Sequence, residues 1–226
     1  MRDLIVILIV VIGALLALRR PQVGVLLWTW VSIMNPHRFT WGFAYSAPVA
    51  AVAAGSTLLG LLFTHNRRSP FQGAPAWWLF AFAIWVTVSW QFGIDPEGDY
   101  PLWDRVMKIY LMTFVALALL YSRKDLLAFA WVTIGSLALL AGKGGLFTVL
   151  TGGSYRVFGP EDSFIADNND FALATVIAIP MMYFLLRQLE KRWMRSAMVV
   201  IILLCVASVL GSHSRGGLLA LVSMGV

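Results

Sequence analysis

Charged side chains are scarce in this sequence. They make up 12% of its 226 residues, about half of the roughly 25% that is typical of a soluble globular domain. Hydrophobic residues reach 60% instead, and their runs are too long and continuous for the alternating ten-residue strands of an outer-membrane barrel. The composition therefore excludes an ordinary soluble domain and indicates an integral membrane protein.

The sequence has only one cysteine, and several catalytic motifs are absent from it. The one cysteine, Cys205, lies inside an apolar run, so an intrachain disulfide is excluded. No H-E-x-x-H motif, Walker loop, nucleophile elbow or C-x-x-C pair occurs. The formal net charge of +6 comes from basic residues dispersed over short loops, and we therefore expect no nucleic-acid partner.

Long apolar runs separated by charged or Gly/Pro-containing breaks predict the topology. The expected fold class is all-α, a polytopic transmembrane helical bundle of about eight full spans plus a truncated ninth, in a single integral membrane domain over residues 1–226. The ninth run has only nine residues, whereas a spanning helix needs roughly 20, so we expect a further part of the natural protein after it. The predicted runs are 4–18, 23–34, 43–63, 76–92, 109–121, 126–141, 171–186, 196–210 and 218–226.

Basic residues divide unevenly between the two faces of this topology. One face holds ten of the seventeen lysine and arginine residues but only two of the eleven acidic residues, and this bias predicts that it is cytoplasmic. The outer face then holds an acidic loop at 95–99, a long loop at 142–170 and the turn at Arg215. This assignment holds whether runs 4–18 and 23–34 cross separately or form one bent unit. The ten basic residues are Arg19, Arg20, Arg67, Arg68, Arg123, Lys124, Arg187, Lys191, Arg192 and Arg195.

The segment Gly211-Ser212-His213-Ser214-Arg215-Gly216-Gly217 lies between two apolar runs. An arginine at the end of a span is costly unless it has a partner or reaches an interface. A guanidinium group suits a phosphate or carboxylate, so we hypothesise that Arg215 binds an anionic lipid-linked substrate at the membrane surface. The alternative is that Arg215 only snorkels to the interface. His213 is either a proton acceptor or, as is more frequent for such a histidine, a structural interfacial residue.

The predicted loop 142–170 carries two basic residues, Lys143 and Arg156, among several glycines. Glycines allow backbone N–H groups to approach a ligand closely. A loop of this length without secondary structure is usually functional or disordered. We therefore expect Lys143 and Arg156 to contact substrate, and the alternative is a solvated linker.

The run Asp167-Asn168-Asn169-Asp170 directly precedes an apolar helix. Three interpretations stay open: these residues cap the helix, its N-terminus faces the substrate, or nearby carboxylates bind a divalent cation. No spacing matches a defined metal-binding loop, so no metal site is predicted. The carboxylates in question belong to Glu161, Asp162, Asp167 and Asp170.

Two segments together resemble the O-antigen ligase and O-antigen polymerase superfamily, and are most similar to the O-glycosylation ligases associated with exosortase A. The family commonly has Asn-Pro-Asn at the helix start, where this chain has Asn168-Asn169 without proline. The turn Asn35-Pro36-His37-Arg38 is also similar to that branch. The resemblance rests on Arg156, Gly159, Phe164, Asp167-Asn168-Asn169-Asp170-Phe171-Ala172-Leu173 and Pro180, then Ser214-Arg215-Gly216-Gly217-Leu218-Leu219-Ala220-Leu221.

The resemblance implies a multi-pass enzyme of the bacterial inner membrane with a periplasmic active face. Such an enzyme transfers a glycan from an undecaprenyl-diphosphate carrier to a hydroxyl of lipid A core or of a protein serine or threonine. It uses no nucleotide sugar, cofactor or metal. Its general base is a histidine in a later periplasmic loop, which is not in this chain. The implied roles are diphosphate charge stabilisation by Arg215 and substrate binding by Arg156, Lys143, Asn168, Asn169, Ser214 and His213.

Three other functions are weighed against this one. An O-antigen polymerase would use the same donor. A transporter or flippase for an anionic or lipid-linked solute predicts paired charges or broken helices near mid-membrane, whereas the polar residues here gather at one face. A scaffold subunit of a polysaccharide complex would tolerate the loss of Arg156 and Arg215 together.

Overall fold

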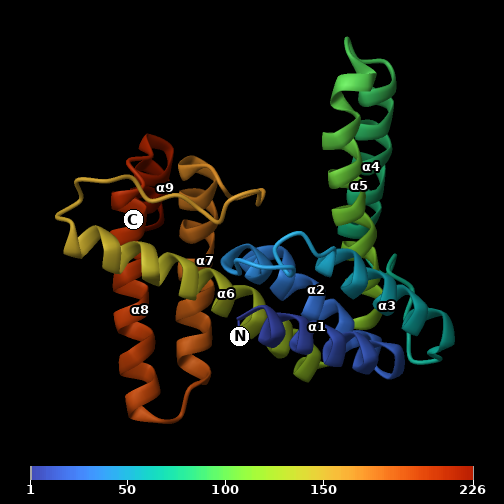
Figure 1. The fold of residues 1–226 in the computed structure, drawn as a ribbon, viewed down its shortest axis with the longest axis horizontal. Helices are drawn as coiled ribbons and strands as arrows, with labels where there is room; N and C mark the ends of the chain where they lie inside the picture. Colours follow the sequence, from blue (N-terminus) through green and yellow to red (C-terminus); the bar gives the residue numbers. More distant parts are fainter. Residues whose placement is uncertain (1, 226) are drawn as a thin grey trace. The chain divides into compact units, whose positions relative to one another are not determined.

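The computed structural model describes residues 2–225 and is helical, as the sequence predicts (Figure 1). Within these residues there are nine α-helices, one short 3-10 helix and no strand, which confirms the all-α class for this part of the chain. Val226, the last residue of the predicted run 218–226, lies outside the described residues. The helices are α1 (Arg2–Arg19), α2 (Pro21–Met34), η1 (Pro36–Phe39), α3 (Val49–Phe63), α4 (Ala74–Gln91), α5 (Pro96–Leu119), α6 (Arg123–Leu150), α7 (Asn168–Gln188), α8 (Arg192–Gly211) and α9 (Arg215–Gly225).

The chain divides into two compact units. The first consists of Met1–Leu8, Trp28–Val49 and Leu127–Val226, and the second of Ile9–Leu27 and Ala50–Leu126. All the candidate site residues predicted from the sequence belong to the first unit. The second unit is therefore described only briefly.

In the second unit, α1 and α2 pack closely against each other at a glycine. Arg20 alone separates α1 from α2, and a Cβ added to Gly13 would lie 2.9 Å from Leu27 Cδ2, so the two helices fold back on each other. Pro21 is suited to the first position of α2 because the N–H it lacks would have no helical partner there. The two N-terminal runs are thus separate helices that pack together.

An aromatic contact holds α4 against α5 in the same unit. The rings of Trp90 and Trp103 stack with centroids 4.4 Å apart, and Trp103 Nε1 donates a hydrogen bond to Thr87 Oγ1 over 3.2 Å. The prediction of an acidic loop at 95–99 is wrong, because Asp95 caps α5 and the helix already begins at Pro96. Proline at the first position and acidic side chains in the first turn both favour a helix start.

Fewer helices meet the requirements of a full membrane span than the sequence predicts. Within the described residues, α6, α7 and α8 are long and apolar enough to cross a membrane. The prediction of about eight full spans is not supported. In α2 and α3 the reason is length, because they have 14 and 15 residues where a crossing needs roughly 20.

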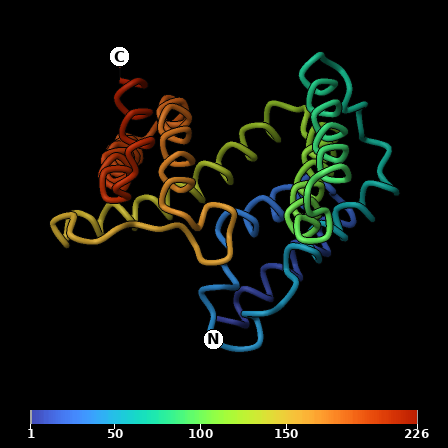
Figure 2. The backbone as a smooth tube through the Cα atoms, turned by 90° about the horizontal axis from the view of Figure 1, so that it is seen from above, coloured from blue at the N-terminus to red at the C-terminus, as the bar shows by residue number. Residues whose placement is uncertain are grey.

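The first unit is built on α7 and α8, which run side by side and are joined by a short turn (Figure 1). Helix α6 runs across this pair rather than alongside it (Figures 1 and 2). The core between them is apolar and includes the fully buried residues Phe171, Met182, Leu185 and Cys205. These side chains hold the two ends of α7 in place, and the polar segments of the unit gather around its N-terminal end.

Two glycines explain how α6 approaches α8 so closely. A Cβ added to Gly145 would overlap the backbone oxygen of Leu204, and one added to Gly144 would lie 2.7 Å from Ser208 Oγ. The prediction that the loop begins at residue 142 is therefore wrong, because Gly142–Gly145 lie inside α6. Their backbone groups belong to the helix, and at Gly144 and Gly145 the absence of a side chain allows the close helix packing.

Candidate functional site

The N-terminus of α7 is tied to the turn between α8 and α9. Asn168 is buried, and its Nδ2 donates a hydrogen bond of 2.9 Å to the backbone oxygen of Ser212. Gly217 lets α9 approach α7, because a Cβ at this position would lie 2.7 Å from Ala172 Cβ. The two segments on which the family resemblance rests are thus in direct contact.

Serine hydroxyl groups organise the turn itself. Ser212 Oγ accepts a hydrogen bond from the backbone N–H of Ser214 over 3.2 Å. Ser214 Oγ in turn accepts one from the N–H of Gly217 over 3.0 Å, which is the pattern of a helix N-cap. Both serines are buried. Ser214, predicted to bind substrate, therefore caps α9 in the structure.

Arg215 is the first residue of α9, and its side chain is exposed. Within residues 2–225 no carboxylate forms an ion pair with it. The described residues therefore leave the charge of this guanidinium group without a compensating carboxylate. An exposed arginine without an internal partner is available to an external anion.

His213 adopts a left-handed backbone conformation with φ of 55°. Its Nε2 lies 3.0 Å from the backbone oxygen of Gly153. The imidazole therefore connects the turn before α9 to the segment that follows α6. This contact fits the structural role that the sequence left open for this histidine.

The connection 151–167 between α6 and α7 is folded onto the unit. The N–H of Val157 donates to the backbone oxygen of Gly211 over 3.0 Å, and the N–H of Gly159 donates to that of Ala166 over 3.1 Å. Val157 and Ile165 are buried in the core. A Cβ at Gly159 would overlap Ile165 O, so glycine is needed at this position. The alternative of a solvated linker therefore does not describe this segment.

Asp167 caps α7, as one interpretation of the sequence proposed. Its carboxylate accepts a hydrogen bond from the N–H of Asn169 over 2.8 Å. This backbone hydrogen bond is the main cause of the lowered pKa of Asp167, because it stabilises the charged carboxylate. Asn169 itself is exposed.

Within the described part of the chain, no three His, Cys, Asp or Glu side chains form a group that could hold a metal ion.

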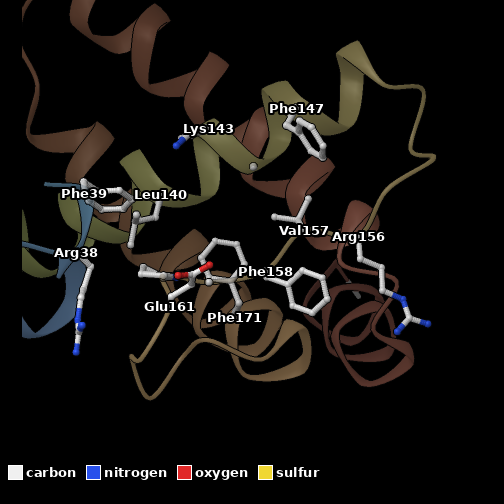
Figure 3. A pocket seen from close by; sticks show the side chains of 13 residues that line it. Arg38, Phe39, Leu140, Lys143, Phe147, Arg156, Val157, Phe158, Glu161 and Phe171 are labelled. Atoms are coloured by element: carbon white, nitrogen blue, oxygen red, sulfur yellow. The ribbon is translucent and has the colours of Figure 1, made fainter. Parts of the chain in front are cut away.

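A cavity of about 470 Å³ lies beside the N-terminal end of α7, where Phe171 lines it (Figure 3). Its volume is in the range of roughly 300–1,000 Å³ typical of small-molecule sites. Three basic residues line it, Arg38, Lys143 and Arg156, together with one acidic residue, Glu161. The rest of the lining is mainly aromatic and aliphatic, with Phe39, Phe147, Phe158 and Phe171 contributing rings.

The basic groups lie around the edge of this cavity. Figure 3 shows Arg38 and Arg156 at opposite ends of the row of aromatic rings, with Lys143 between them. Lys143 Nζ lies 5.6 Å from the centroid of the Phe39 ring, a cation–π arrangement. The structure thus brings Lys143 and Arg156 to one cavity, and Arg215 does not line it.

Arg38 is the basic residue of the cavity lining that the sequence did not assign to a site. Its Nη2 lies 3.3 Å from Asp162 Oδ2, and its guanidinium carbon lies 4.6 Å from the centroid of the Tyr45 ring. The available signal was its place in the turn after Asn35-Pro36, on the predicted outer face. That signal alone could not bring it to α6 and the 151–167 segment, which are far away in sequence.

Comparison with known families supplies a classification. A model described as "Family of unknown function (DUF5935)" matches residues 1–190. The chain belongs to this family. No curated protein and no solved structure matches the chain.

The DUF5935 match covers only part of the site. Arg38, Lys143, Arg156 and Asn168 lie within residues 1–190, whereas the turn that leads to Arg215 lies after them. The cavity and the N-terminus of α7 are therefore inside the family region. The Ser-Arg-Gly turn is connected to that region by the Asn168 and Val157 hydrogen bonds.

Proposed function

We propose that this chain is part of a membrane glycosyltransferase of the O-antigen ligase type. In this proposal it binds an undecaprenyl-diphosphate-linked glycan at the periplasmic face of the bacterial inner membrane. The glycan is transferred to a hydroxyl group of lipid A core oligosaccharide or of a protein serine or threonine. The three long apolar helices of the described chain are compatible with an integral membrane enzyme.

The hydrogen bond from Asn168 to Ser212 carries the proposal. It joins the start of α7 to the turn before α9, the two segments that resemble this superfamily. Arg215 follows that turn with an exposed side chain and, among the described residues, no carboxylate partner. The same neighbourhood holds the Val157–Gly211 bond, next to Arg156.

The chemistry explains why arginine is suited to this position. When the bond between the sugar and the lipid diphosphate breaks, negative charge grows on the phosphate oxygens. A guanidinium group in place before the reaction stabilises that charge, and losing one such donor typically slows a reaction by about 10²–10³-fold. We assign this role to Arg215. Arg156 and Lys143 would orient the donor from the neighbouring cavity.

The general base is not assigned to a residue of this chain. His213 contacts the backbone oxygen of Gly153, and this position suits a structural role. In the proposed reaction the acceptor hydroxyl loses its proton to a base in another part of the enzyme. The residues described here would then bind the donor and stabilise its leaving group.

Deletion of the gene that encodes this chain tests the proposal in cells. We expect the undecaprenyl-linked glycan to accumulate at the periplasmic face while the acceptor stays unglycosylated, and the full-length gene should restore transfer. An acceptor that still carries a single repeat unit would indicate polymerase activity instead. Accumulation of the donor at the cytoplasmic face would contradict the proposal and favour the flippase alternative.

A further inference from the structure

The Arg38–Asp162 ion pair lies at one end of the cavity and is open to solvent. The side chain of Arg38 is 28% exposed and that of Asp162 is 61% exposed. Arg38 lines the cavity, whereas Asp162 does not. The carboxylate therefore holds the cation from outside the space in which a ligand would lie.

The exposure of this ion pair makes it weak. Water and salt screen charges that are this exposed, so a pair of this kind contributes little to stability. A guanidinium group carries five N–H donors, and within residues 2–225 Asp162 is its only carboxylate partner. The ring of Tyr45 lies against the guanidinium and keeps the plane of the group in place while its edges stay available.

The chemistry of the lining indicates the ligand. The three cations at the rim outnumber the one carboxylate, Glu161, so the cavity favours an anion. The rings of Phe39 and Phe158 are partly exposed, at 40% and 58%, and they offer apolar surface for the carbon face of a sugar. A sugar phosphate has both an anionic group for the cations and a carbon face for the rings.

We infer that Arg38 is an anion-binding residue of this cavity, and that Asp162 occupies its guanidinium group until a sugar phosphate enters. The ligand's phosphate then replaces the carboxylate as the partner of Arg38. No covalent step is involved. The inference rests on the proposed function only in naming the phosphate-bearing sugar of a glycan donor as the natural ligand.

Calorimetric titration of the purified full chain in nanodiscs tests this exchange, with glucose 1-phosphate as the probe. Arg38→Gln should weaken binding by about tenfold or more, the value of one charge-assisted hydrogen bond. Asp162→Asn should strengthen binding, because it frees Arg38. The double variant should bind as weakly as Arg38→Gln alone.

A purely structural ion pair makes the opposite prediction for Asp162. In that case both single variants would weaken binding equally, and this result would overturn the inference. Unchanged binding in Arg38→Gln would overturn it as well. Lys108→Gln is the matched control, because it removes the exposed ion pair with Asp104 in the other compact unit and should leave binding unchanged.

Two further ligands test the sugar phosphate assignment. Glucose should bind far more weakly than glucose 1-phosphate, and inorganic phosphate should also bind more weakly. Inorganic phosphate that binds as tightly would contradict the role of the aromatic rings. If Arg38→Gln loses binding while deletion of the gene leaves glycan transfer intact, the proposed function fails and the inference stands. If deletion of the gene abolishes glycan transfer while Arg38→Gln binds glucose 1-phosphate as the wild type does, the proposed function stands and the inference fails.

Discussion

Asn168 Nδ2 lies 2.9 Å from the backbone oxygen of Ser212, although 44 positions separate the two residues in sequence. The bond fastens the start of α7 to the turn that presents Arg215. Because Asn168 is buried, its side-chain amide cannot donate this hydrogen bond to water instead. The position of the proposed catalytic arginine therefore depends on this contact.

Loss of this amide should reduce stability. Asn168→Ala removes the donor and leaves Ser212 O without it, and we expect a loss of about 1 kcal/mol. Thermal unfolding of the purified protein in detergent measures the change. The matched control is Asn169→Ala, since Asn169 is exposed at the next position. Equal effects of the two variants would show that the bond contributes nothing specific.

The crossing of α6 and α8 should be sensitive to a single methyl group. Gly145→Ala would place Cβ into Leu204 O, and we expect a loss of about 1–3 kcal/mol, as is usual for overpacking. At Gly142, nothing lies within 4 Å of an added Cβ. Gly142→Ala should therefore stabilise the helix by up to about 1 kcal/mol. Comparable unfolding temperatures for both variants would refute the close crossing.

The cap of α7 should make stability dependent on pH. The hydrogen bond from Asn169 lowers the pKa of Asp167 below its ordinary value of 3.8. The unfolded chain therefore binds the proton more readily, and the contribution of the cap is present above pH 3.8 and is lost as the pH falls through the lowered pKa.

Two substitutions separate the charge of Asp167 from its hydrogen bond. Asp167→Asn keeps a side-chain acceptor and should remove this part of the pH dependence, whereas Asp167→Ala should lose the cap at every pH. Unfolding curves of the wild type and both variants, recorded between pH 3 and pH 7, measure the difference. An unchanged pH dependence in Asp167→Asn would contradict the contribution assigned to the charged Asp167 carboxylate, and wild-type stability of Asp167→Ala would argue against the cap.

The sequence predicted the helical class and the positions of α7 and α8. It assigned their polar ends to one face but did not predict the hydrogen bond between them. It failed where distant parts of the chain decide the outcome. The glycines at 142–145 are typical of a loop, but packing of Gly145 on Leu204 keeps them in α6. The miss at Asp95 has a local cause instead, because Pro96 and the acidic residues around it are typical of a solvated turn but equally suit the first turn of a helix.

The candidate site was predicted in part for the same reason. The sequence pointed to Lys143 and Arg156, and both line the cavity. Arg38 was missed because its ion pair with Asp162 joins segments that no local pattern relates. The role of Ser214 as a helix cap also depends on geometry, since a serine before an arginine suits either a cap or a ligand contact.

Glycan transfer should not require a divalent cation. In the proposed reaction, cationic side chains supply the positive charge that a metal would otherwise provide. We expect the same transfer rate in membranes treated with EDTA and in untreated membranes. Loss of transfer that added Mg²⁺ restores would favour the acidic residues Glu161, Asp162, Asp167 and Asp170 as metal ligands instead.

The most direct test is glycan transfer by Arg215→Ala in cells that lack the native gene, beside Arg123→Ala as a control. Both arginines are exposed and begin a helix, but Arg123 is on the predicted cytoplasmic face. We predict that Arg215→Ala lowers transfer by about 10²–10³-fold, with normal protein levels in the membrane, and that Arg123→Ala retains activity. Wild-type transfer by Arg215→Ala would contradict the role of this guanidinium group.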